Sequence, residues 1–102
     1  MPLRLPALPL DANAEAVKRA RAWVQDVFEG LDRSDLLDAA ESGVSELVTN
    51  AVLHGGPPIS IGVRGTQRYP RVEVQDGSRQ PTGPDDAIAL FPEPDQLIER
   101  RR

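Results

Sequence analysis

Residues 45–65, SELVTNAVLHGGPPISIGVRG, decide the fold, because the spacing of their apolar side chains changes halfway along the stretch. In the first half, apolar residues recur at helical spacing, which continues the pattern of the preceding segment. The GGPP segment, 55–58, ends such a helix, because glycine and proline are poor helix formers. After it, apolar and polar residues alternate, as in a strand with one buried face. The stretch therefore predicts a helix over 34–54 and a strand over 59–64.

The flanking segments repeat these two patterns. Residues 14–29 carry apolar side chains at helical spacing and are followed by Gly30, so they predict a first helix. Residues 71–76 alternate again and predict a second strand, which a short hairpin joins to the first. In residues 3–11 leucines alternate with other residues, but two prolines there cannot donate hydrogen bonds to a sheet. A strand in this segment is therefore expected at an edge of the sheet.

This order of elements predicts a two-layer α/β (α+β) sandwich, with both helices on one face of an antiparallel sheet. Asp11 or Asn13 is the expected N-cap of the first helix, and Ser34 is the expected N-cap of the second. The chain is interpreted as one domain over 1–102, with its core in 3–77. The remaining segment, 78–102, is rich in proline and has little periodicity, so we expect a lid-like loop and tail there, in which DQLIERRR can add a short helix.

Composition and charge exclude several classes of function. The chain has 102 residues and no cysteine, which excludes disulfides, zinc–thiolate sites and thiol nucleophiles. No apolar run is long enough to span a membrane, and the proline-containing N-terminus does not match a signal peptide, so we expect a cytoplasmic protein. The net charge is −4, which disfavours direct nucleic-acid binding, because phosphates attract a basic surface.

Three polar side chains, Glu46, Asn50 and His54, follow one another at successive helical turns and border the apolar stripe of the second helix. Each has an ordinary interpretation as a surface residue, and a histidine in the last turn also favours the helix dipole. A carboxylate can, however, accept a proton from an attacking hydroxyl group. An amide oxygen is a hard ligand for Mg²⁺, which binds few protein oxygens beside phosphates and water. Glu46 and Asn50 are therefore a candidate site for a magnesium–triphosphate complex.

Asp76 is a second candidate, at the end of the last predicted strand and directly before Gly77. An Asp-Gly pair most often forms a turn. A carboxylate in this place can also lie inside a pocket and accept a hydrogen bond from an exocyclic amine such as that of adenine. One hairpin lies between the helix stop and this motif. The helix motif with Glu46 and Asn50, followed by Asp76-Gly77, indicates a nucleotide site much more specifically than either motif alone.

In this order the two motifs resemble the GHKL superfamily of ATP-binding domains, which includes gyrase and the histidine kinases. The subfamily that the chain resembles most is the bacterial anti-sigma-factor serine/threonine kinases. The stretches that carry the resemblance are ESGVSELVTNAVLHGGPPISIGV and RVEVQDGS. The resemblance covers residues 3 to about 85 and implies the Bergerat-type fold of that superfamily.

The resemblance also implies roles for individual residues. Glu46 would be the general base, Asn50 the ligand of Mg²⁺, and Asp76 the group that holds the adenine amine. The residues implied to bind the nucleotide are Asn50, His54, Asp76, Gly77 and Ser78. The implied activity is transfer of the γ-phosphoryl group of ATP to a serine of an anti-sigma-factor antagonist, in a regulator of transcription. A sigma factor would be a further partner, and a homodimer is one possible assembly.

Two departures from the family pattern bear on activity. The first glycine box of the family reads D-x-G-x-G, whereas here Ser78 and Gln80 stand at the two glycine positions. The second glycine box, which cradles the phosphates at a helix N-terminus, has no counterpart before residue 102. We therefore expect weak nucleotide affinity and little phosphoryl transfer. The alternative function is a truncated or degenerate GHKL module that binds a protein partner without catalysis. A histidine-kinase fragment fits less well, because no phosphoacceptor helix precedes the fold.

Overall fold

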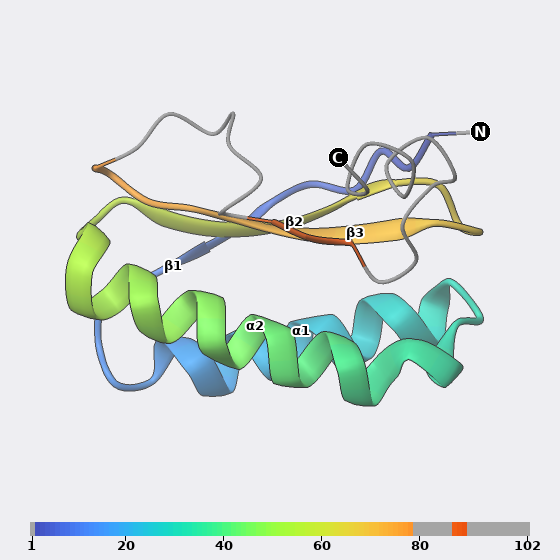
Figure 1. The fold of residues 1–102 in the computed structure, drawn as a ribbon, viewed down its shortest axis with the longest axis horizontal. Coiled ribbons are helices and arrows are strands. Elements are labelled where there is room, and N and C mark those ends of the chain that lie inside the picture. The colour runs from blue at the N-terminus through green and yellow to red at the C-terminus, as the bar shows by residue number, and fades with distance from the viewer. Residues whose placement is uncertain (1, 79–86, 90–102) are drawn as a thin grey trace, which may run out of the picture.

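The structure is a computed structural model, and it describes residues 2–78 and 87–89. Two main helices and four strands make up this part of the chain (Figure 1). In chain order the elements are β1 (Leu8–Leu10), α1 (Ala16–Gly30), the 3-10 turn η1 (Ser34–Leu36), α2 (Leu37–Asn50), the π-helical end η2 (Ala51–Gly55), β2 (Ile59–Gly65), β3 (Pro70–Gln75) and β4 (Ala87–Ala89).

The strands form one antiparallel sheet in the order β1-β2-β3-β4. The hairpin of β2 and β3 places Ile61 opposite Val74 and Val63 opposite Val72. Figure 1 shows both helices beneath the same face of this sheet. The two-layer α+β architecture and the antiparallel pairing of the two strands are therefore confirmed, and β1 lies at an edge of the sheet as its prolines predict.

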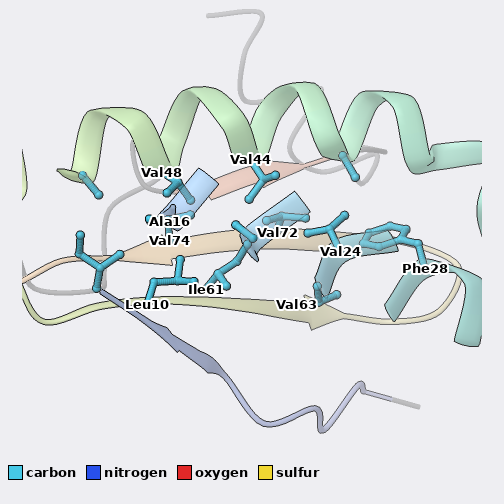
Figure 2. Packing of buried hydrophobic residues seen from close by; sticks show 14 of the residues in the cluster. Leu10, Ala16, Val24, Phe28, Val44, Val48, Ile61, Val63, Val72 and Val74 are labelled. Carbon is cyan, nitrogen blue, oxygen red and sulfur yellow. The ribbon is translucent and has the colours of Figure 1, made fainter. Parts of the chain in front are cut away.

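The core fills the space between the sheet and the two helices (Figure 2). α1 buries one residue per turn on a single face, and α2 does the same, whereas β2 and β3 bury every other residue. The largest fully buried apolar side chains include Val24, Phe28, Val44, Val48, Ile59, Ile61, Val63 and Val72. Burying each such side chain contributes about 1.5–3 kcal/mol, so this face fixes how the helices lie on the sheet.

Arg33 fastens the turn between the helices to the β2–β3 hairpin. Its guanidinium donates to the backbone carbonyls of Gln67 and Arg68, at 2.9 and 3.0 Å, and to both carboxylate oxygens of Asp35, at 3.0 and 2.9 Å. These side-chain hydrogen bonds, together with the attraction between the charges, hold the pKa of Asp35 below its ordinary value. The contact lies at the end of the helices away from η2.

Two details of the fold differ from the predictions. Ser34 is not the N-cap of α2, because the chain first makes the η1 turn and α2 starts after Leu36. Likewise α1 starts after Glu15, whose backbone N–H donates to the Asn13 side chain at 2.9 Å in the preceding turn. Around Ser34 the contacts of Arg33 with the hairpin hold the turn, and they outweigh the local preference of a capping residue.

The segment expected to be a loop, 78–102, contains a strand. β4 pairs with β3, with Ile88 opposite Val72. The terminal helix expected in DQLIERRR lies outside the described residues. Within the described part of the chain, neither main helix is both long and apolar enough to cross a membrane.

Candidate functional site

The helix stop and the end of β3 are far apart in the sequence but meet in the structure. The Gly56 backbone N–H donates to the Ala51 carbonyl at 3.0 Å and closes the π-helical turn η2. Gly56 has a φ of 77°, a conformation that glycine adopts without steric cost. Its carbonyl then accepts a hydrogen bond from the Gly77 N–H at 2.9 Å. The Gly-Gly stop therefore holds the Asp76–Gly77 motif against the end of the helix.

The Asp76 carboxyl group lies directly on Gly55. A Cβ atom at Gly55 would overlap the Oδ2 and Cγ atoms of Asp76, so only glycine leaves room for this arrangement. The other carboxylate oxygen, Oδ1, accepts hydrogen bonds from the Ser78 backbone N–H at 3.0 Å and hydroxyl at 2.8 Å. Oδ2, the oxygen that lies against Gly55, accepts no hydrogen bond from the residues that the structure describes.

At Gly77, as at Gly55, the packing leaves no room for a side chain. A Cβ atom at Gly77 would overlap the backbone carbonyl oxygen of Pro57. The two glycines therefore let the two segments pack at backbone distance. We name this close-packed region, Gly55–Pro57 with 76–77, the glycine junction.

The three polar residues predicted on the helix all reach solvent. Glu46 and Asn50 on α2 and His54 on η2 are exposed, because the opposite face of the helix carries the core. Asn50 is five residues before Gly55, which corresponds to about 7 Å along the helix axis at the usual rise per residue. Asp76 is partly buried, deeper than any of the three. Asn50, His54 and Asp76 thus share one end of the molecule, and Glu46 lies one turn further along α2.

The oxygen donors that the structure describes at this end are too few to hold a metal ion by themselves. They better suit a metal ion that is also coordinated by phosphate groups. Within the described ranges, no three His, Asp or Glu side chains converge to hold a metal ion. Asn50 offers one amide oxygen at the exposed helix surface. Mg²⁺ commonly takes one or two protein oxygens and completes its shell with phosphates and water, so this donor set fits a Mg–nucleotide complex.

Two residues of this region were missed by reasoning from the sequence. Gly55 was read only as a helix stop, although its missing side chain gives Asp76 its place. Leu53, between Asn50 and His54, is a large apolar side chain that is 67% exposed. Helical spacing is the signal that could have identified Leu53, because it places this residue on the same side of the helix as Glu46 and Asn50.

Comparison with models of known protein families gives no match for this sequence, and comparison with curated proteins gives no significant match.

Proposed function

We propose that this protein binds Mg-ATP at the glycine junction, with the weak affinity expected from its altered first glycine box, and acts as an anti-sigma regulatory protein that resembles the serine/threonine kinases. One observation carries the proposal: the Asp76 carboxyl lies on Gly55, at the end of the helix that bears Asn50. A partly buried carboxylate with a free oxygen is a suitable acceptor for the adenine amine. Asn50, about 7 Å from Gly55 along the helix axis, offers a hard oxygen ligand for the metal that accompanies the phosphates.

Each residue has a part in this proposal. Asp76 accepts the adenine amine, while Gly77 and Ser78 keep its carboxylate in place through the turn that they form. Asn50 binds Mg²⁺, which when bound neutralises charge on the phosphates. His54 lies beside Asn50 and contacts the nucleotide. Glu46 orients or deprotonates the serine hydroxyl of the acceptor protein.

The partners of this proposal are a sigma factor and an anti-sigma-factor antagonist that supplies the serine. The second candidate function is binding of a protein partner without catalysis. The observation that favours it is the exposed Leu53 beside the exposed Asn50 and His54. A surface that combines an apolar and several polar side chains suits a protein partner as well as a nucleotide.

A thermal-shift titration with ATP, with and without Mg²⁺, tests nucleotide binding. At ATP concentrations about ten times the dissociation constant, binding adds about 1.4 kcal/mol to the free energy of unfolding. We expect the melting temperature of the native chain to rise with Mg-ATP and to rise less when EDTA removes the metal. Asn50→Ala should lose the part of the rise that depends on Mg²⁺.

Thr49→Ala is the matched control, because Thr49 is the exposed neighbour of Asn50 and has no part in the proposed site. It should respond to Mg-ATP as the native chain does. The absence of any rise in the native chain, across millimolar ATP, would contradict nucleotide binding and leave the partner-binding module. A rise that Asn50→Ala retains in full would contradict the role given to Asn50.

A further inference from the structure

The face of the sheet that points away from the helices carries a groove. Because the alternate residues of β2 and β3 are buried under the helices, the remaining ones face outward. The N-terminal segment runs beside β2, its Leu3 N–H donating to the Gly65 carbonyl at 2.8 Å. We call the hollow between this segment and the two strands the outer groove. Its lining includes Leu5, Ala7, Ser60, Gly62, Glu73 and Gln75, with Arg64 at one end.

Gly62 keeps the outer groove open, although the fold does not require a glycine there. Its φ is outside the left-handed range that favours glycine. Among the residues that the structure describes, a Cβ atom at Gly62 would come within 4 Å of one atom only, the Ala7 Cβ, at an ordinary contact distance of 3.9 Å. Glycine inside a strand weakens it, and it often marks a place where a ligand or another backbone approaches closely.

Two arginines at one end of the groove share a single carboxylate. Arg64 and Arg71 lie directly opposite each other on β2 and β3, an arrangement that is unfavourable for like charges. Glu73 bridges them, since its two oxygens lie 3.2 Å from Arg64 Nε and 3.1 Å from Arg71 Nε. The terminal nitrogens of both guanidinium groups make no hydrogen bond to other residues of the described part. Their side chains are 67% and 39% exposed, so the pair carries one positive charge in excess at the surface.

The other end of the groove offers neutral polar groups. Ser60 and Gln75 lie opposite each other, and neither side chain hydrogen-bonds to another described residue. Leu5 adds an apolar side chain that is 37% exposed. From Ser60 to Arg64 the groove follows β2 for about 13 Å, which matches about four residues of extended chain.

We propose that the outer groove binds an extended peptide segment of a partner protein, with an acidic side chain seated on Arg64 and Arg71. The carboxylate pairs with the terminal guanidinium nitrogens that Glu73 leaves unused. The peptide backbone passes over Gly62 at close distance, and its amides meet Ser60 and Gln75. A second copy of this chain fits less well, because its outer face presents the same two arginines. This site is on the opposite face of the sheet from the helices and does not depend on the nucleotide proposal.

A titration followed by amide chemical shifts in NMR spectra tests the proposal. The probe is an acetylated and amidated peptide of alanine and leucine with one glutamate, compared with the same peptide carrying glutamine instead. We expect the glutamate peptide to shift amides of β2 and β3 and to bind more weakly as salt is added. Replacing both arginines, Arg64→Gln with Arg71→Gln, should weaken it by about tenfold or more.

Gly62→Val tests whether peptide binding requires the open groove, because it fills the groove and leaves both arginines in place. Valine suits a strand, and among the described residues a Cβ at Gly62 meets only the Ala7 Cβ, at an ordinary contact distance, so we expect this variant to melt close to the native chain. It should nevertheless lose peptide binding, because the side chain fills the groove. Arg19→Gln, on the exposed face of α1, is the control for net charge and should bind as the native chain does.

Four results would overturn the proposal. The glutamine peptide could bind equally well, or Gly62→Val could bind as tightly as the native chain. The same shifts on raising the protein concentration alone, without peptide, would identify a second copy as the occupant. The same shifts with inorganic phosphate alone would identify a simple anion site in place of a peptide groove.

Discussion

Gly55→Ala is expected to lower the free energy of unfolding by about 1–3 kcal/mol, the usual cost of forcing extra atoms into a packed site. The added methyl group would overlap the Asp76 carboxyl, so either the end of the helix or the end of β3 has to move. Chemical denaturation with urea, followed by circular dichroism, measures the change. Gly30→Ala is the matched control. No atom of another described segment lies within 4 Å of a Cβ there, so it should be neutral or stabilise by about 0.4–1 kcal/mol.

A second substitution at Asp76 tests whether that overlap is the cause. Asp76→Gly in the Gly55→Ala background removes the three atoms that lie nearest to the new methyl group, so it should restore most of the lost stability. Asp76→Ala should restore less, because the Asp76 Cβ would remain 2.8 Å from the added atom. Equal losses in the single and double variants would show that Asp76 does not lie on Gly55 in solution.

Gly77→Ala is expected to be as damaging, about 1–3 kcal/mol, but without the possibility of rescue. Here the added methyl group would overlap the backbone carbonyl of Pro57, which no change of side chain removes. The shift would also strain the 2.9 Å hydrogen bond from the Gly77 N–H to Gly56.

The readout is the same urea denaturation. Asp76→Gly in the Gly77→Ala background should leave the loss unchanged, in contrast to its effect on Gly55→Ala. A Gly77→Ala variant as stable as the native chain would contradict the close packing of the glycine junction.

Most of the fold could be predicted from the sequence, because the burial of each element follows a simple period. The switch from helical to alternating spacing around Gly55–Pro58 predicted α2, β2 and their order correctly. β4 could not be predicted, since three residues, Ala87–Ala89, are too few to show alternation. Ser34 failed as an N-cap because the contacts of Arg33 with the hairpin, distant in sequence, shape that turn.

The candidate site was predictable in its residue types but not in its geometry. Spacing on one helix placed Glu46, Asn50 and His54 together, because a helical period is local. The position of Asp76 depends on the hairpin register and on a missing side chain at Gly55, and neither can be read from local pattern. The outer groove was not predicted either, because it too depends on contacts between segments that are distant in sequence. Ala7, Gly62 and Glu73 line it together only in the folded chain.

If the Asp76 carboxylate receives the amine of adenine, the protein should discriminate between adenine and guanine. Isothermal titration of the native chain and of Asp76→Ala with Mg-ATP and Mg-GTP measures this discrimination, since guanine carries a carbonyl where adenine carries the amine. A hydrogen bond to a charged group contributes about 1.5–3 kcal/mol. We therefore expect the native chain to prefer ATP by about tenfold or more, and Asp76→Ala to lose that preference. Equal affinity of the native chain for both nucleotides, or an undiminished preference in Asp76→Ala, would contradict the account.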